Sequence, residues 1–464
     1  MKYFFRKKSF FIIFLVCVFL LTTGLSCTKG GSKSAQEAYQ PTRIVYWSVW
    51  NDEDVIRPLI TAYRRLRPNV TVEYRKLRFE DYENELIEAM ADGRGPDIFS
   101  IHNTWMQRYQ GKDRLLALPS SIQIPVKYTT GTIQKEEVIE FRTTKSLTAL
   151  DVKNKFLDFV ADDAVYDNKV YGLPIYSDNL AMFYNVNLLR NAGIIEPPTN
   201  WSDFQDMVKR ITKIDAESGN ILVSGAALGT ADNIPRSFDI LSLLMMQNLA
   251  PMLDSRGRAA FNKRPAEVSS GVPAVGALEY YVQFASPLFE AYCWNSEMPN
   301  ALEAFADGRV GFFFGYSYHR DQIDALAPGL NYAIAPVPQV GEQQKINYAS
   351  YWLETVSSKT ENSDYAWDFV QFISNEDNVA EFLTAAKRPT ALKSTQIINQ
   401  QLADEDLYVF ADQLFTADSW YRGNNVAGAE TAFAEMIDAL LQGELSTIQA
   451  LNQAVDKVDR SIYE

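Results

Sequence analysis

Between residues 43 and 101 the chain alternates between short runs of strand-forming residues and longer amphipathic segments. β-Branched and aromatic residues fill residues 44–50, and apolar residues then recur at helical spacing until Pro68. The same order repeats in residues 70–77, in an amphipathic segment ended by Gly93, and in the short apolar run 97–101. Strand, helix, strand, helix, strand is typical of βαβ units, so the pattern predicts an α/β fold containing a parallel sheet.

A second alternating region predicts a second α/β half. Residues 171–184 are extended, a helix is expected over 201–211, and a strand over 221–228. A helix ending at Gly308 and a strand over 310–314 continue the pattern, and the last third is mostly helical, with Ser446 and Gln449 forming a capping box. The polar stretch 120–146 lacks this rhythm and is interpreted as an insertion or surface hairpin. With 464 residues, the chain is long enough for two large lobes.

The first 26 residues have the features of an export signal. Four positive residues precede an apolar run of 12 residues, 10–21, which is too short to span a bilayer. The following Leu25-Ser26-Cys27 resembles the lipobox of bacterial lipoproteins, in which the cysteine is lipidated; a plain signal peptide or anchor is the alternative. Removing residues 1–26 changes the net charge from −14 to −18. Residues 27–41 are expected to be a flexible tether, and Cys293, left without a partner, a buried apolar residue.

Composition and motifs exclude several classes of function. The acidic charge would repel nucleic acid, so we expect no nucleic-acid partner. Three cysteines and two histidines argue against a disulfide framework and a histidine-rich metal site. The sequence contains no G-x-S-x-G, H-E-x-x-H, C-x-x-C or Walker A motif. Adjacent acids such as Asp162 and Asp163 could suggest a glycosidase, but a solvated surface is the preferred interpretation. We therefore expect that the protein is not an enzyme and that it binds no cofactor or metal.

Tryptophan and tyrosine cluster near the ends of predicted strands. The carboxyl ends of the strands line the ligand crevice of an open α/β sheet. Flat aromatic rings suit the C–H faces of sugars, while carboxylate, amide and guanidinium groups bond hydroxyls. Taken singly, each ring is better explained as a core residue than as a ligand contact, but their joint placement favours a carbohydrate site. These aromatic candidates are Trp47, Trp50, Trp105, Tyr176, Tyr316, Tyr318, Tyr351, Trp352, Trp420 and Tyr421.

Several segments, in the same order, resemble the bacterial extracellular solute-binding proteins of family 1, the sugar-type receptors of ABC importers. Residues 95–99, Gly-Pro-Asp-Ile-Phe, resemble the family's G-x-P-D-I segment, and residues 170–189 its Y-G-L-P and Y-N-x-x-L-L segments. Residues 199–201 are similar to its T-x-W helix start, and residues 305–315 to its F-x-x-G-K/R segment. Trp367-Asp368-Phe369 and residues 443–451 are similar to its C-terminal helices. The resemblance extends from about residue 43 to the end.

The resemblance implies a two-lobed, type II periplasmic-binding-protein-like fold with discontinuous lobes and a hinge. We expect the N-terminal lobe to comprise residues 42–177 and 352–392, and the C-terminal lobe residues 180–348 and 396–464. The hinge crossings would lie near residues 176–179, 347–352 and 389–394. Ligand would bind between the lobes, and hinge closure would bury it.

The resemblance also implies ligand-binding roles for individual residues of this chain. The residues after Asp97-Ile98 usually enter the cleft, which implicates His102, Asn103 and Trp105. An acid often follows the L-P segment, here Asp178, and Glu83 lies where maltose-type members place a ligand acid. Many members have a tryptophan two residues after the position of Gly315, whereas this chain has Ser317 between two tyrosines, either of which could replace the ring. Trp420, Tyr421 and Arg422 are further candidates without a motif.

The sequence therefore predicts a monomeric, extracytoplasmic receptor, attached to the membrane by lipid on Cys27, that binds a sugar or oligosaccharide and delivers it to an ABC permease. Two alternatives stay open. A secreted lipoprotein polysaccharide hydrolase would need two acids facing each other across the cleft. A binding protein for another solute is also compatible; clustered tyrosines would suit ferric ion, and basic cleft residues a phosphate ester.

Overall fold

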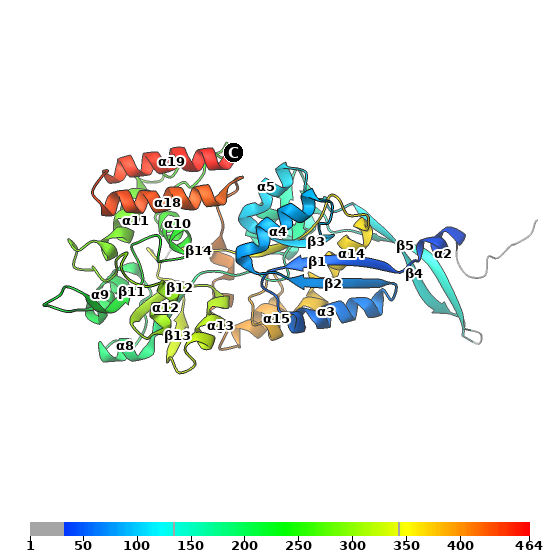
Figure 1. Cartoon of the computed structure of the whole chain (residues 1–464), viewed down its shortest axis with the longest axis horizontal. Helices are drawn as coiled ribbons and strands as arrows, with labels where there is room; N and C mark the ends of the chain where they lie inside the picture. The colour runs from blue at the N-terminus through cyan, green and yellow to red at the C-terminus, as the bar shows by residue number, and fades with distance from the viewer. Residues whose placement is uncertain (1–31, 133–134, 342–343) are drawn as a thin grey trace, which may run out of the picture.

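The computed structural model describes residues 32–464, except 133–134 and 342–343, and forms two α/β lobes that lie side by side (Figure 1). Each lobe contains one five-stranded sheet and its own cluster of buried apolar side chains. The predicted fold class, a two-lobed α/β protein built from discontinuous segments, is confirmed. Cys27 and the export signal lie outside the described residues.

The N-terminal lobe contains the sheet with strand order β2-β1-β3-β15-β8. The first three strands are parallel, as the alternating pattern predicts, because helices carry the chain back between them. β15 runs antiparallel to β3 and pairs Trp352 with His102, so the start of β15 and the end of β3 lie at the same edge. The strands are β1 (Thr42–Ser48), β2 (Val70–Lys76), β3 (Ile98–His102), β8 (Gly172–Leu173) and β15 (Trp352–Val356).

Helices cover both faces of this sheet. α3 and α4 each begin with two acids in the first turn, which suits the positive end of a helix dipole. The apolar spacing of residues 152–160 predicts one helix, but the structure has two, because the backbone at Phe156 is extended. The helices of the lobe are α3 (Glu53–Leu66), α4 (Phe79–Ala91), α5 (Met106–Gly111), α6 (Ala149–Lys155), α7 (Asp158–Ala164), α14 (Ser363–Ile373), α15 (Glu376–Ala386) and α16 (Thr395–Leu402).

The C-terminal lobe contains the sheet with strand order β10-β11-β12-β9-β13. Its central strand β12 is buried along its whole length, which fits its continuous apolar sequence. Gly225 on β11 permits close packing of α9, because a Cβ there would lie 2.4 Å from the carbonyl oxygen of Val208. The strands are β9 (Ala181–Asn185), β10 (Lys213–Ile214), β11 (Ile221–Ala226), β12 (Val310–Gly315) and β13 (Tyr332–Ala335).

The helices of this lobe include the two long C-terminal ones, which pack against each other. The capping box expected at Ser446 and Gln449 is present and opens α19. The helices are α8 (Val186–Asn191), α9 (Trp201–Ile211), α10 (Ser237–Gln247), α11 (Pro273–Val282), α12 (Ala301–Ala306), α13 (Ser317–Leu326), α17 (Tyr408–Asp412), α18 (Val426–Leu441) and α19 (Thr447–Tyr463).

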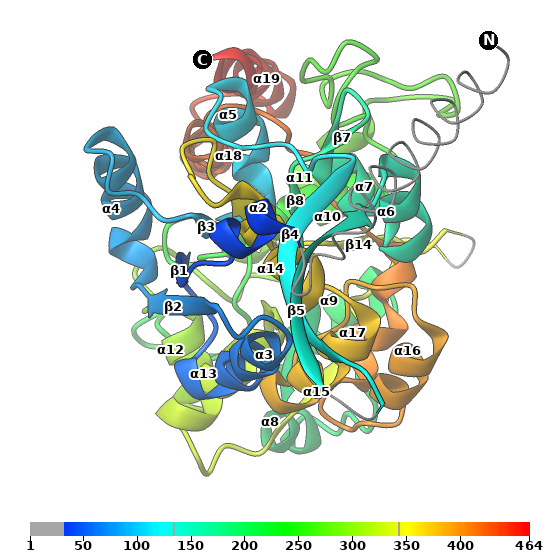
Figure 2. The same cartoon turned by 90° about the vertical axis from the view of Figure 1, so that its right-hand side faces the viewer.

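The polar segment expected to be an insertion or hairpin forms a two-stranded antiparallel ribbon, β4 (Ser121–Thr130) and β5 (Glu136–Lys145). It extends from the end of the N-terminal lobe that is far from the other lobe (Figure 1). α2 (Lys33–Ala38) lies beside the ribbon (Figure 2) and buries Ala35. Residues 33–38, which were expected to be part of a flexible tether, form a short helix instead. Ser32 caps this helix, and the small side chain of Ala35 is buried where the helix contacts the ribbon.

The chain passes between the two cores at three places. The first crossing follows Tyr176, which packs in the N-terminal core, and precedes Leu180 in the other core. The second separates Tyr348 from Ala349. The third lies further along the chain than the expected residues 389–394, because Ile397 and Ile398 in α16 still pack in the N-terminal core. Among the described residues, no helix is both long and apolar enough to span a membrane.

A pair of short strands strengthens the second and third crossings. β14 (Asn347–Tyr348) pairs in parallel with β16 (Ala417–Asp418). A second small pair, β6 (Val165–Tyr166) and β7 (Lys169–Val170), closes a tight turn in the N-terminal lobe.

Candidate functional site

A cavity of about 330 Å³ lies between the lobes. Its lining comes from both cores and from the crossings between them, so a ligand in it would contact both halves of the molecule. The lining residues that the sequence analysis singled out are Trp50, Glu83, His102, Trp105, Tyr176, Asp178, Tyr318, Tyr351 and Trp352. The others are Phe79, Thr104, Arg108, Pro235, Arg236, Ser350, Arg388, Val426, Ala427 and Glu430.

Aromatic rings form the N-terminal wall of the cavity, with Trp352 at their centre. The Trp352 ring meets Trp105 edge to face, with ring centroids 5.3 Å apart, and His102 in the same way at 5.6 Å. Trp50 and Phe79 lie further along, at 6.5 and 6.2 Å from Trp352. The rings gather here because β1, β3 and β15 all present an end at this edge of the sheet. The wall offers the flat apolar faces that sugar rings favour.

His102 is held as a neutral hydrogen-bonding group. Its Nδ1 lies 2.8 Å from Thr104 Oγ1, and its Nε2 lies 2.9 Å from Ser350 Oγ, across the second crossing. Burial, together with the nearby charge of Arg236, lowers the pKa of His102 to about 3. The imidazole therefore stays uncharged at physiological pH and positions the hydroxyls beside it.

Glu83 and Arg108 form an ion pair at the side of the aromatic wall. The Arg108 guanidinium also lies over the Tyr109 ring, 5.5 Å from its centroid, and Tyr109 donates a 3.4 Å hydrogen bond to Glu83. Burial lowers the pKa of Arg108. The pair presents a carboxylate and a guanidinium together, which can bond adjacent hydroxyls without adding net charge.

Asp178 lies at the first crossing and joins it to the C-terminal lobe. Its carboxylate accepts hydrogen bonds from the Ser317 backbone N–H at 3.1 Å and the Ser317 hydroxyl at 2.7 Å, at the start of α13. Burial raises the pKa of Asp178 to about 6, and the bonds from Ser317 oppose this increase. The expected ligand acid thus borders the cavity, but its carboxylate is already bonded to the protein.

The C-terminal wall is formed by Tyr318, Arg236 and the first turns of α18. Tyr316 is not part of it, because its ring is fully buried and its hydroxyl donates a 2.7 Å hydrogen bond to Asp239. Arg236 lies 3.4 Å from Asp239 and stacks its guanidinium 5.7 Å from the Tyr316 centroid. Of the two tyrosines that could replace the missing tryptophan, Tyr318 borders the cavity.

Six of the predicted binding residues lie outside this cavity. Trp47 is buried, with the Arg75 guanidinium 4.9 Å from its ring centroid. Trp420 is buried and donates a 2.9 Å hydrogen bond to Ser242. The remaining four are core or interlobe residues: Asn103, Tyr316, Tyr421 and Arg422. Five of the six side chains are buried, and Arg422 is half-buried.

Two of these residues, Asn103 and Arg422, lie outside the cavity because they bind the carboxylate of Asp163. Its carboxylate is buried and accepts hydrogen bonds from Asn103 at 3.0 Å, Tyr351 at 2.9 Å and Ser419 at 2.8 Å. Arg422 donates to it at 3.1 Å. The interpretation of Asp162 and Asp163 as a solvated pair is therefore wrong for Asp163, which connects the N-terminal lobe to the segment that follows β16.

The residues that sequence reasoning missed share one property, which is that none belongs to a conspicuous pattern. Phe79 and Arg108 lie in amphipathic segments where their apolar and basic character is ordinary. Arg388 precedes Pro389 in the expected third crossing, which is the only sequence signal that could have indicated it. Pro235, Arg236 and Glu430 reach the cavity only through the packing of α10 and α18.

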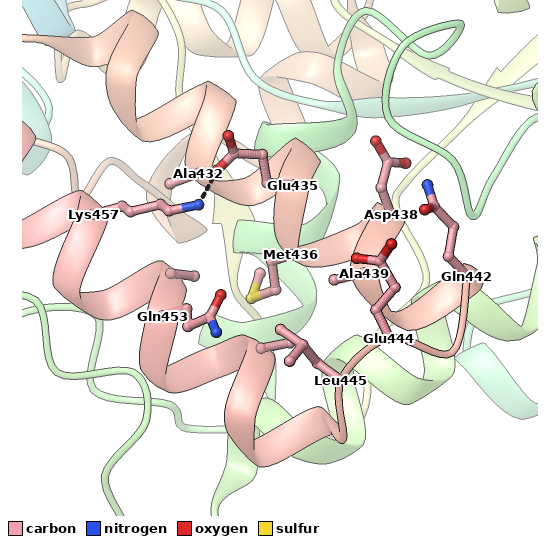
Figure 3. Close-up of a pocket in the computed structure, with 12 residues that line it drawn as sticks. Ala432, Glu435, Met436, Asp438, Ala439, Gln442, Glu444, Leu445, Gln453 and Lys457 are labelled. Atoms are coloured by element: carbon pink, nitrogen blue, oxygen red, sulfur yellow. Dashed lines mark hydrogen bonds and ion pairs between the residues drawn. The ribbon is translucent and has the colours of Figure 1, made fainter.

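Two further hollows lie in the C-terminal lobe. One of about 290 Å³ lies between α18 and α19, where Glu435 pairs with Lys457 above Met436 and Leu445 (Figure 3). Its lining comes from one helical pair and the turn that joins it, so it does not connect the lobes. Another, of about 590 Å³, is lined by Trp420, Arg422 and apolar residues such as Met252. Within the described ranges, no three His, Cys, Asp or Glu side chains are grouped to hold a metal ion.

Several proteins whose sequences resemble this chain are binding proteins. Three binding proteins from Brucella abortus and Brucella suis are 26% identical over 263 residues, which covers 56% of this chain and only 58% of theirs. A galactooligosaccharide-binding protein from Bacillus subtilis is 20% identical over 82% of this chain and 80% of its own length.

Solved structures share the fold. A cyclic alpha-maltosyl-1,6-maltose binding protein from Arthrobacter globiformis aligns with a TM-score of 0.71 at 19% identity, covering 91% of this chain and 99% of that one. The sugar-binding protein MalE from Xanthomonas citri aligns with a TM-score of 0.68 at 17% identity, covering 90% and 97%. The family model described as bacterial extracellular solute-binding protein matches residues 59–405. With that match over most of its length, this chain belongs to the bacterial extracellular solute-binding proteins.

Proposed function

We propose that this protein captures a saccharide outside the cell membrane in the cavity between its lobes and delivers it to the permease of an ABC importer. The observation that carries the proposal is the composition of the cavity. A wall of aromatic rings around Trp352 faces polar groups such as Arg236 and Ser350. Saccharides present apolar ring faces and a border of hydroxyls, and this lining matches both. The names of the relatives support the same class of ligand.

The mechanism follows from the placement of the cavity. A ligand that bonds to both lobes favours the conformation in which both sets of contacts are made, so binding shifts the population toward closure. Three crossings form the hinge, and Asp178 and Ser350 lie on two of them. The permease then recognises the closed form, and no bond in the ligand is made or broken.

The proposal is tested by identifying the ligand. Native mass spectrometry of the protein purified from its own cells, followed by isothermal titration with a panel of saccharides, is expected to give one class of saccharide with a submicromolar to micromolar Kd. Heat from a non-sugar solute alone would contradict the saccharide claim. Turnover of a chromogenic glycoside would indicate a hydrolase instead, although Glu83 and Asp178 are both engaged by other side chains.

We also propose lipidation of Cys27 as the means of attachment. Full-length protein expressed in a host with lipoprotein processing is expected to partition into detergent and to incorporate a fatty-acid label. Cys27→Ser is expected to abolish both. Cys293→Ser is the matched control, since Cys293 is buried in the C-terminal lobe and a change there leaves partitioning unaltered. Incorporation of label into the Cys27→Ser protein would contradict the assignment.

A further inference from the structure

A column of stacked aromatic rings crosses from one lobe to the other at the side of the cavity. Trp50, from the N-terminal lobe, stacks on Tyr318, from the C-terminal lobe, with ring centroids 5.1 Å apart and planes inclined by 23°. Phe79 continues the column beyond Trp50 at 5.6 Å, and Tyr316 continues it beyond Tyr318 at 5.9 Å. Two rings at such a separation are in direct contact, so no third ring fits between them.

The C-terminal half of the column is firmly fixed. His319 stacks on Tyr318 at 4.2 Å, and its Nδ1 accepts a 2.9 Å hydrogen bond from the Tyr316 backbone N–H. Tyr316 is anchored to Asp239 by its hydroxyl, and the Arg236 guanidinium lies over its ring, 5.7 Å from the centroid. Because this half of the column is held by hydrogen bonds and an ion pair, Tyr318 presents a rigid surface to the opposite lobe.

The N-terminal half reaches the surface of the protein. Trp50 follows β1 in a loop whose backbone is tied down by a hydrogen bond from Tyr74 to the Asn51 carbonyl. Phe79, at the outer end of the column, is 48% exposed. The column therefore runs from solvent at Phe79 to the buried Tyr316, and the contact between Trp50 and Tyr318 forms part of the cavity wall on that side.

α18 contributes exposed residues to the lining of the cavity. Ala427 and Glu430, on the first turns of α18, line the cavity and are themselves exposed. Its volume of about 330 Å³ is at the low end for a small-molecule site.

From this geometry we infer that Trp50 and Tyr318 form an aromatic gate that closes one side of the cavity and limits the bound saccharide to one or two rings. The inference rests on the proposed function and adds a specificity-determining role to it. A longer chain has to part the two rings, and it loses their stacking, so it binds less well. The gate selects against long ligands by obstruction, in addition to the contacts that favour short ones.

Titration with a series of increasing chain length tests the gate. The wild type is expected to prefer the one- or two-ring saccharide over its four-ring homologue by about tenfold or more in Kd. Trp50→Ala and Tyr318→Ala are each expected to abolish most of that preference by improving binding of the longer homologue. Tyr318→Phe keeps the ring and should retain the wild-type preference for the short saccharide. Tyr463→Ala, at an exposed site near the C-terminus, is the matched control.

Each contrary result has a definite meaning. If the alanine variants lose affinity for all lengths to the same extent, the two rings are a binding platform for the ligand, and the gate is overturned. A wild type that binds the longer homologues as well as the short ones overturns it too. Circular dichroism and thermal unfolding of each variant show whether a lost affinity comes from misfolding; in that case Trp50→Leu and Tyr318→Leu, which retain apolar bulk, replace the alanine variants.

A second measurement tests the contact between positions 50 and 318 independently of saccharide binding. In the full-length protein carrying Trp50→Cys and Tyr318→Cys, a short bifunctional thiol cross-linker is expected to join the two lobes without any saccharide. The wild type, whose Cys293 is buried, should remain unlinked. Cross-linking without saccharide binding would refute the proposed ligand while leaving the interlobe contact intact. Failure to cross-link, with saccharide binding preserved, would refute the gate alone.

Discussion

Single residues hold the two lobes together through buried polar contacts. Asp163 is almost completely buried, yet it collects four donors, two of which, Ser419 and Arg422, come from the segment following the third crossing. Burial raises the pKa of Asp163, and the charge of Arg422 opposes that increase. A buried carboxylate is stabilising only while its partners are present, so this site is sensitive to the loss of any one of them.

We predict that Arg422→Ala lowers the free energy of unfolding by about 3 kcal/mol, because it leaves the Asp163 charge buried without its cation. Chemical denaturation checks the value. Arg309→Ala is the control, since Arg309 pairs with Asp307 on the surface, with both side chains about half exposed, and its loss should cost less than about 1 kcal/mol. Equal effects of the two substitutions would contradict the importance assigned to the buried pair.

A second buried acid, Glu354, makes the stability of the N-terminal lobe depend on pH. It lies in β15, accepts a 2.7 Å hydrogen bond from Ser100, and is 2% exposed. Burial raises its pKa from 4.5 to about 7, while bonds from Ser100 and Tyr46 oppose the increase. The folded protein thus binds this proton more tightly than the unfolded chain does, so stability falls as pH rises from about 4.5 to 7.

We predict that Glu354→Gln removes this dependence. The change in the free energy of unfolding that the substitution causes is expected to be about 3 kcal/mol more stabilising at pH 8 than at pH 4. The amide keeps an acceptor for Ser100 and does not titrate. Denaturation curves at several pH values measure the difference. Glu361→Gln, at an exposed position, is expected to leave the pH profile as in the wild type. A profile of Glu354→Gln that parallels the wild type would show that the carboxyl group does not titrate in this range.

At the scale of elements, the alternation of strands and helices predicted most of the two sheets. The pattern over residues 43–101 corresponds to β1, α3, β2, α4 and β3 with shifts of one or two residues. α13 was missed because its sequence, Ser317–Leu326, is polar and carries few apolar residues. The short helix α2 was missed because its stability comes from contact with the ribbon formed by β4 and β5, which local sequence does not express.

The binding residues were less predictable than the elements. Rings at strand ends, such as Trp352 and Trp105, reach the cavity because strand ends meet at one edge of the sheet. Trp420 and Tyr421 satisfy the same sequence criterion but lie in the core, since the direction of a side chain depends on how helices such as α18 pack over it. Arg236 could be placed only by the tertiary structure, and the position of Arg388 before Pro389 in the expected third crossing was the only sequence signal for that residue.

We predict that Gly225→Ala destabilises the C-terminal lobe by about 3 kcal/mol or more, because the new methyl group would meet the backbone of α9 at 2.4 Å. Thermal unfolding measures the loss. The control is Gly276→Ala in α11, where a Cβ meets nothing within 4 Å and alanine favours the helix by about 1 kcal/mol. A neutral Gly225→Ala would mean that α9 can move away from the sheet at little cost.

At the scale of the whole molecule, the two cores are separate and only the crossings and the interlobe contacts connect them. We predict that a saccharide ligand shifts this molecule toward its more compact form. Small-angle scattering is expected to give a smaller radius of gyration with saturating ligand than without it, as binding energy is used for closure. Identical scattering in the two states, with binding confirmed by titration, would contradict a hinge mechanism.

The position of α2 limits how the protein can be oriented at a membrane if Cys27 is lipidated as proposed. Four residues lie between Cys27 and Ser32, which caps α2, and the five Cα steps from Cys27 to Ser32 span no more than about 18 Å even in a fully extended chain. If Cys27 is lipidated as proposed, the start of α2 is kept within that distance of the anchored residue, so the end of the N-terminal lobe that carries the ribbon is the end nearer the bilayer. The C-terminal lobe lies at the opposite end of the long axis (Figure 1) and would then be the lobe with more freedom to move relative to the membrane.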